Sequence, residues 1–181
     1  MRRLTNDKLD YRNVAWLPDS KSLLITAKEV GKPVRVFLQP IDGGEPRPLT
    51  PEGYSAPKNL VAPDGKTFVA RQGTSRKRLL WPISGGESGK EIPGLEPADV
   101  MLRWSADGRS IFTYQNADRK TMLITRVDVA TGNRQVVKEW LPADRAGVTG
   151  YFSAGISTDG KTIVYSYNRV VGDLYLVEGL R

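Results

Sequence analysis

The chain of 181 residues contains neither cysteine nor histidine. The absence of cysteine excludes disulfides, thiolate zinc sites and cysteine nucleophiles. The absence of histidine removes the usual general base, and with it the Ser-His-Asp triad and nearly every catalytic zinc site. We therefore expect no catalytic residues, no metal and no cofactor in this chain.

Long apolar runs are also absent. No stretch of 18 apolar residues exists, and the segment that begins with Met1 has no apolar core of the kind found in signal peptides. We expect no membrane span and no signal peptide here. The 18 glycines and 12 prolines predict many turns and no long helices.

Positive charge exceeds negative charge, with 27 Lys and Arg against 20 Asp and Glu, a formal net charge of +7. This balance suggests an anionic partner, although +7 also lies within the ordinary range for solubility. Hydrophobic residues make up 39% and charged residues 26%, which is typical of a globular domain.

Four ten-residue segments share one pattern. Each has an apolar residue three positions before an Asp, then Gly or Ser, a basic residue, Ser or Thr, and an apolar run. The Asp residues stand 45, 43 and 52 positions apart. This self-similarity predicts a repeat architecture. The segments are Trp16–Ile25, Val61–Ala70, Trp104–Thr113 and Ile156–Tyr165, with Asp19, Asp64, Asp107 and Asp159 at the matching positions.

Each unit is predicted to hold four strands, which we call A to D. An Asp-Gly pair between apolar runs predicts a tight turn between strands A and B, because Gly takes positive φ without strain. We expect the four Asp side chains to hold these turns and not a metal, because no Asp-x-Asp-x-Asp-Gly run exists. Strand C follows at 34–38, 79–83, 122–127 and 174–177, and strand D at 47–50, 90–93 and 134–137.

Four antiparallel strands in about 40 residues, repeated, form the blade of a β-propeller. The fourth unit has no strand D, and residues 2–6 resemble the strand D at 47–50. We therefore predict an all-β propeller with four blade units, at about 11–50, 54–95, 98–140 and 148–181, the last completed by 1–6. The ring closes within one chain, or two chains form one eight-bladed ring as a homodimer.

The Pro-Asp-Gly-Lys turn at 63–66 and the Ile-Asp-Gly-Gly-Glu turn at 41–45 resemble the TolB-type, WD-repeat-like propeller repeat of bacteria, over essentially the whole chain. The stretches 165–169 and 173–179 are similar to the end of bacterial eukaryotic-like serine/threonine kinases, where a propeller follows a kinase domain and a membrane span. The resemblance implies a non-catalytic protein- or ligand-binding module, a scaffold or sensor from a larger bacterial signalling protein outside the cytoplasm. The alternative is the propeller part of a hydrolase whose catalytic domain is absent.

The loops between strands B and C are basic in all four units and should share one face of the propeller. A protein or small anionic ligand is the partner this face favours; the alternative is a solvated surface. Nucleic acid is not expected, because no aromatic residues interleave the basic cluster. The residues of this candidate binding face are Lys28, Lys32, Arg76, Lys77, Arg78, Arg119, Lys120 and Arg169.

Strand A should line the central channel, which makes Arg103 and Asn59 candidate channel residues. Alternatively, Arg103 is a strand-end residue satisfied by neighbouring carbonyls. Trp16 and Trp104 are predicted to lie in the core between blades, and Trp81 and Trp140 to be partly exposed.

Overall fold

The computed structural model describes residues 4–5, 8–58, 60–75, 77–118, 121–176 and 178, and within these ranges it contains strands and no α-helix. The predicted residues Arg76, Arg119, Lys120 and Asn59 lie outside the described residues. The strands are β1 (Asp10–Trp16), β2 (Ser22–Lys28), β3 (Val34–Pro40), β4 (Arg47–Pro48), β5 (Tyr54–Ser55), β6 (Thr67–Gln72), β7 (Leu79–Pro82), β8 (Lys90–Glu91), β9 (Val100–Trp104), β10 (Ser110–Asn116), β11 (Met122–Asp128), β12 (Arg134–Trp140), β13 (Val148–Ile156) and β14 (Ile163–Arg169).

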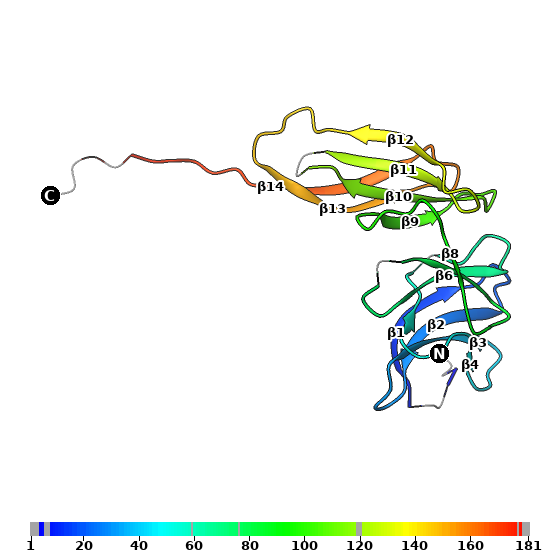
Figure 1. Cartoon of the computed structure of the whole chain (residues 1–181). Coiled ribbons are helices and arrows are strands. Elements are labelled where there is room, and N and C mark those ends of the chain that lie inside the picture. The colour runs from blue at the N-terminus through cyan, green and yellow to red at the C-terminus, as the bar shows by residue number, and fades with distance from the viewer. Residues whose placement is uncertain are drawn as a thin grey trace.

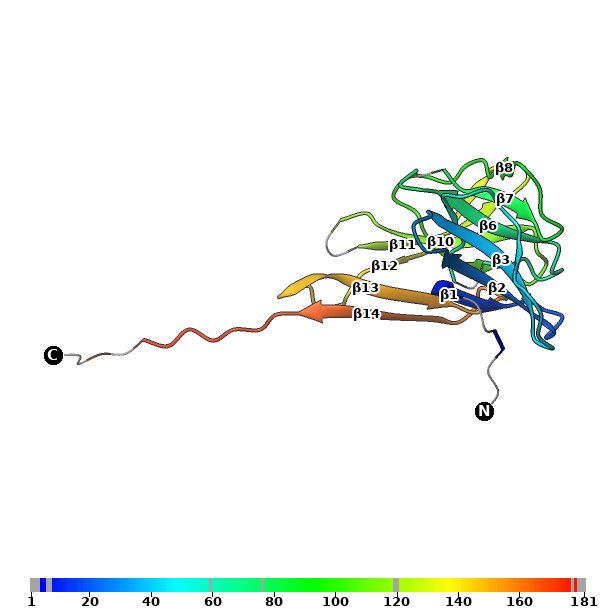
Figure 2. The ribbon, with the colours of Figure 1, turned by 90° about the horizontal axis from the view of Figure 1, so that it is seen from below.

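These strands form four antiparallel sheets in chain order (Figures 1 and 2). We call them blade 1 (β1–β4), blade 2 (β5–β8), blade 3 (β9–β12) and blade 4 (β13–β14). Blades 1 to 3 have four strands each and blade 4 has two. The predicted all-β propeller architecture is confirmed, with three complete blades and the first hairpin of a fourth.

The Asp residue of each repeat holds the turn between strands A and B. An Oδ1 atom of Asp19 accepts hydrogen bonds from the amides of Lys21 and Ser22 at 2.8 and 3.0 Å. Asp64, Asp107 and Asp159 accept the equivalent bond from the amide two positions later, at 2.9 to 3.0 Å. The prediction that these carboxylates hold turns is therefore confirmed.

Hydrophobic clusters join each blade to the next. Blades 1 and 2 share a cluster around Phe68 and Trp81, blades 2 and 3 one around Trp104, and blades 3 and 4 one around Phe112 and Tyr151. Two indole groups add hydrogen bonds across these junctions. Nε1 of Trp81 donates to the Leu49 carbonyl at 3.0 Å and Nε1 of Trp104 to the Leu60 carbonyl at 3.1 Å. The prediction of partial exposure was wrong for Trp81, which is fully buried.

Trp16 differs from its repeat equivalents. Val61, Trp104 and Ile156 each pack into the junction with the preceding blade, whereas Trp16 is 61% exposed. Its predicted place in the core was wrong because blade 1 has no preceding blade in this chain. None of the four hydrophobic clusters of the described residues joins blade 4 to blade 1.

The closure of blade 4 by residues 1–6 stays a prediction, because most of that segment lies outside the described residues. Leu4, from the described part of that segment, packs with Leu9 and Ile41 against the outer face of blade 1. Residues 174–176, the described part of the predicted third strand of blade 4, form no strand: residues 170–176 run away from the sheets (Figure 1), and Leu174 is fully exposed. A strand with no fourth strand beside it and no following blade gains too little buried area to offset its ordering entropy.

Candidate functional site

Several cations of the predicted basic face are paired with carboxylates nearby. Lys32 pairs with Glu29 in the same loop, Nζ of Lys77 lies 2.8 Å from a carboxylate oxygen of Glu91, and Arg169 pairs with an Asp at 144. Lys28 ends β2 and is half-buried. Exposed ion pairs of this kind contribute little to the stability of the fold, and their carboxylates partly cancel the positive potential of the predicted basic face.

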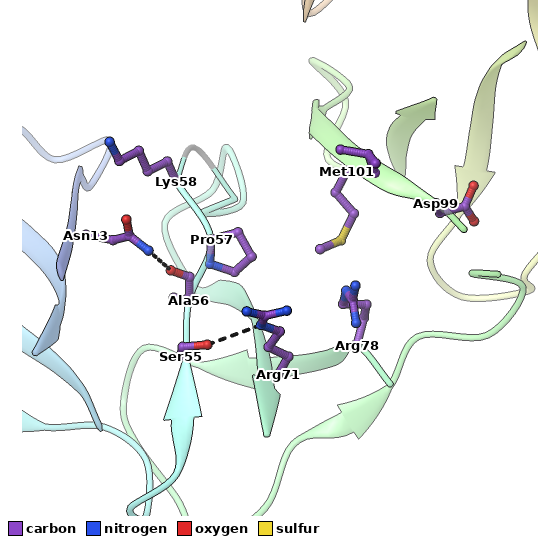
Figure 3. A pocket seen from close by; sticks show the side chains of 10 residues that line it. Asn13, Ser55, Ala56, Pro57, Lys58, Arg71, Arg78, Asp99 and Met101 are labelled. Carbon is purple, nitrogen blue, oxygen red and sulfur yellow. Dashed lines mark hydrogen bonds between the residues drawn. The ribbon is translucent and has the colours of Figure 1, made fainter. Parts of the chain in front are cut away.

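Arg78 has a different environment from its neighbour Lys77. It directly precedes β7 and lines a hollow of about 390 Å³ where blades 1, 2 and 3 meet, which we call the axial hollow (Figure 3). Arg71, from the end of β6, lies beside it. The other lining residues are Asn13, Ser55, Ala56, Pro57, Lys58, Asp99, Val100 and Met101.

Each of the two guanidinium groups makes a hydrogen bond to a serine residue. Nε of Arg71 lies 3.5 Å from Oγ of Ser55, and Nη1 of Arg78 lies 3.5 Å from the Ser75 carbonyl oxygen. Burial lowers the pKa of Arg78, and the positive charge of Arg71 lowers it further. Two like charges therefore face one partly buried space, an arrangement that an anion would relieve.

One wall of the axial hollow is fixed by hydrogen bonds between blades 1 and 2. Nδ2 of Asn13 and Oγ1 of Thr26 both donate to the Ala56 carbonyl at 3.3 Å, and the Ala56 amide donates to Thr26 Oγ1 at 3.0 Å. These bonds hold the inner strand of blade 2 against blade 1, so the hollow has a preformed wall.

Asp99 forms the opposite margin and is nearly buried. It accepts bonds from Arg134 Nη1 at 2.6 Å, the Glu96 amide at 2.7 Å, Gln115 Nε2 at 2.9 Å and Thr113 Oγ1 at 3.0 Å. Burial alone raises the pKa of Asp99, but the bond from Arg134 and the other donors outweigh it and lower the pKa below its usual value. Asp99 is thus an ionised group neutralised by Arg134. The sequence did not single out this residue.

Arg103, the candidate channel residue, donates from Nη1 to the Ile156 carbonyl at 3.0 Å. This bond agrees with the alternative interpretation, in which a neighbouring carbonyl satisfies Arg103, and its role as a channel residue stays a prediction. Arg103 also lines a separate hollow with Trp16 and Val61. The structure does not bring it together with the two arginines of the axial hollow.

Sequence reasoning missed an aromatic cluster between blades 3 and 4. Trp140 contacts Tyr165, Tyr151 and Tyr167 with ring centroids 4.1 to 5.8 Å apart. Burial, with smaller effects from neighbouring charges, raises the pKa of Tyr151. The alternation of Tyr165 and Tyr167 along β14 was the available signal, because alternate residues share one face of a strand.

The described residues offer no group of three or more Asp and Glu side chains that could hold a metal ion. No helix in the described part of the chain is long and apolar enough to cross a membrane. The prominent chemistry of the axial hollow is therefore a pair of guanidinium groups beside a neutralised carboxylate.

Comparison with solved structures identifies the architecture. The chain superposes on a structure assigned as TolB from Agrobacterium tumefaciens with a TM-score of 0.59 at 17% identity, covering 96% of this chain and 66% of that one. For TolB from Acinetobacter baumannii the TM-score is 0.55 at 20% identity, over 86% of this chain and 42% of that one. The chain has the fold of a TolB-type β-propeller.

This fold also occurs in proteins named as enzymes. An oligogalacturonate lyase from Vibrio parahaemolyticus matches with a TM-score of 0.56 at 13% identity, over 90% of this chain and 54% of that one. In sequence, the chain is 26% identical over 159 residues to an uncharacterized peptidase, YuxL, from Bacillus subtilis. The matched region covers 84% of this chain but only 21% of YuxL. No family model matches the chain.

Proposed function

We propose that this propeller is a non-catalytic binding module whose site is the axial hollow. The observation that carries the proposal is the meeting of three blades around Arg71 and Arg78, with a wall preformed by the bonds to Ala56. A concave, preformed site with a few convergent polar groups is the usual form of a small-ligand site. The chain has no histidine or cysteine to serve as base or nucleophile.

A thermal-shift panel of short peptides, nucleotides, peptidoglycan fragments and small carboxylates tests this proposal. The double variant R71Q/R78Q serves as the comparison, with K77Q as a control for charge outside the hollow. We expect at least one compound to raise the melting temperature of the wild type and of K77Q but not of R71Q/R78Q. Equal stabilisation of all three proteins would place the binding site elsewhere.

A second candidate function is the propeller part of a hydrolase, favoured by the similarity to YuxL. In that case the catalytic residues lie outside this chain, and the axial hollow guides a substrate. Incubation of the purified chain with a fluorogenic peptide library should show no turnover under either candidate function. Turnover that persists through repeated purification would overturn the non-catalytic assignment.

We also propose that the module belongs to a larger bacterial signalling protein and lies outside the cytoplasm. The likeness to the TolB structures supports this placement, and the tail at 165–169 and 173–179 supports a relation to kinase-associated propellers. The chain spans about a fifth of YuxL and 42% of the Acinetobacter TolB structure, which is consistent with a module of a longer protein. Expression of a reporter fusion to the natural full-length protein would test the location.

A second copy of the chain is the partner we propose for the open ends. Five positions after the repeat Asp, Leu24, Val69 and Phe112 are buried against the following blade, whereas Val164 is 66% exposed. Trp16 is exposed at the other end. At each internal junction, the equivalent of Val164 from one blade and the equivalent of Trp16 from the next blade belong to the same hydrophobic cluster. Val164 of one copy could therefore pack with Trp16 of another, so that blade 4 of the first copy continues onto blade 1 of the second.

Light scattering over a range of concentrations tests this assembly. We expect a mass twice the 20.0 kDa of the chain at high concentration. V164D should reduce it to the monomer mass, whereas V170D, at an equally exposed valine beyond β14, should not. A strictly monomeric mass at every concentration would exclude the homodimer.

A further inference from the structure

The tail that follows β14 has the spacing of a propeller strand. The third strands of blades 1 and 3, β3 and β11, both begin 15 residues after the repeat Asp, at Val34 and Met122. Leu174 stands 15 residues after Asp159. Residues 174–176 are therefore in register to form the third strand of blade 4, although here they run away from the sheets (Figure 1).

β14 offers this tail an open edge. In blades 1 and 3 the second strand pairs with the third over seven residues, whereas β13 is the one strand that pairs with β14 among the described residues. The other edge of β14 therefore presents backbone amides and carbonyls to which a further strand can bond. Blade 3 pairs Tyr114 with Ile124, and the same offsets from the repeat Asp match Ser166 with Leu176.

The tail carries apolar side chains at the positions that a blade turns towards the next blade. Met122 and Ile124, at the matching positions of blade 3, are fully buried in the cluster that joins blades 3 and 4. The equivalent of Val164 belongs to the same cluster, and alternate residues of a strand share one face. A docked tail therefore adds two leucines to the face of blade 4 that holds Val164. In this structure Leu174 is 100% and Leu176 85% exposed.

We propose that residues 174–176 dock onto β14 when a second copy of the chain covers blade 4, and that Leu174 and Leu176 then form part of the interface. This inference rests on the proposed homodimer, because it adds residues to the same interface. At every internal junction the surface that covers such a face is the next blade. Among the described residues blade 1 is the blade with no preceding neighbour, so blade 1 of a second copy is the matching cover.

Blade 1 presents apolar groups to such a contact. On its inner strand Val14 is 48% and Trp16 61% exposed. Leu4 and Leu9 are partly buried side chains that pack over β2 and β3 on the outer face of the blade. We expect the two tail leucines to contact Leu4 and Leu9 of the second copy, while Val164 packs with Trp16.

The second copy supplies the burial that the tail lacks in a single chain. Docking in the monomer leaves both leucines in contact with water, so the new hydrogen bonds alone have to offset the lost conformational freedom of the tail. In the dimer the leucines are buried as well, and ordering of the tail is coupled to association. By linkage, a docked tail strengthens association by the same factor by which association favours docking.

A label beside the tail tests this coupling, because the chain has no cysteine of its own. D173C carries a nitroxide spin label next to the tail, and S88C, in the exposed segment before β8, carries a control label. Electron paramagnetic resonance spectra and light-scattering masses are recorded at the same protein concentrations. We expect the label at position 173 to be mobile in the monomer and immobilised in the dimer, and the spectrum of the label at position 88 to stay unchanged.

Two substitutions measure what the tail leucines contribute to association. L176D removes an apolar side chain from the interface and should weaken dimerisation by about tenfold or more, as for one buried leucine. V171D makes the same kind of change at a valine that is 79% exposed and precedes the predicted strand, and it should weaken dimerisation by about twofold or less. Neither variant should change the melting temperature of the dilute monomer, because both side chains are exposed there.

The outcomes separate the docking of the tail from the homodimer. A label at position 173 that stays mobile in a dimer of the expected mass, or equal effects of L176D and V171D, would overturn the docking and leave the homodimer standing. An immobilised label in the dilute monomer would also overturn the coupling, because the tail would then dock without a second copy. A strictly monomeric mass at every concentration would remove the homodimer and this inference with it.

Discussion

Trp104 and Trp16 occupy equivalent positions three residues before the repeat Asp, but only Trp104 has a preceding blade to pack against. Trp104 is 4% exposed and lies among Leu60 and Ala62 of blade 2. Trp16 is mostly exposed. The same large-to-small substitution at the two sites therefore measures what one blade contributes to the burial of a tryptophan in the next.

The expected magnitudes follow from these exposures. A tryptophan that buries about 200 Å² at about 25 cal/mol per Å² contributes about 5 kcal/mol, and Trp-to-Ala changes in cores cost about 3–5 kcal/mol. We expect W104A to lower the free energy of unfolding by about 3–5 kcal/mol, including the loss of the bond to the Leu60 carbonyl. W16A should cost about 1–2 kcal/mol or less, in proportion to its smaller buried area.

Urea unfolding followed by circular dichroism provides the measurement, because the signal comes from the strands and not from the altered tryptophan. The experiment is run at low concentration, where the monomer dominates, and W104F controls for loss of the indole donor alone. A W16A cost as large as that of W104A at every concentration would refute the reasoning, because it would mean that this chain already covers Trp16. A cost that rises with concentration would instead support the second copy.

Three further predictions concern the turns, the Asp99 network and the tail. Ser20 has a φ of 54°, where the other repeats have Gly, so S20G should raise the free energy of unfolding by about 0.5–1 kcal/mol in urea unfolding, and G160S should lower it. The pKa of Asp99 is lowered in the fold, so the ionised side chain stabilises the protein above the unfolded pKa near 3.8, and this stabilisation is lost as pH falls through the folded pKa. D99N should therefore lower the melting temperature at pH 7, and the melting temperature of the variant should decline less steeply below about pH 4 than that of the wild type. Truncation before Leu174 should leave the melting temperature unchanged in calorimetry, because residues 174–176 are exposed; a large decrease would mean that the tail packs in solution.

Local chemistry repeated along the chain was sufficient to predict the architecture. The Asp-Gly turns and the apolar runs beside them identify the strands because a turn residue and its neighbours interact over a few positions. The four-strand units of blades 1 to 3 and the role of Asp19 and its equivalents were predictable for this reason. The basic loops were also visible, although not which of their charges would be paired.

The site depended on contacts between residues far apart in the chain. Arg71 and Arg78 line a hollow with Asn13 and Met101 only because three blades meet there, and nothing in the sequence around Arg78 distinguishes it from Lys77. Likewise, the neutralisation of Asp99 by Arg134 joins positions 35 residues apart. Contacts between residues so far apart in the chain leave no periodic pattern in the local sequence, so they could not be predicted from it.

The sequence by itself determined the strands, the turns and the repeat, because these follow from short-range backbone preferences and alternation of apolar residues. Only the tertiary structure decided which equivalent positions are buried. Trp16 and Trp104 share one sequence pattern, and so do Val164 and Val69, but burial is set by whether a neighbouring blade is present. The same reason explains why residues 174–176 form no strand: their pattern suits one, but its stability would come from burial against a neighbouring strand and blade.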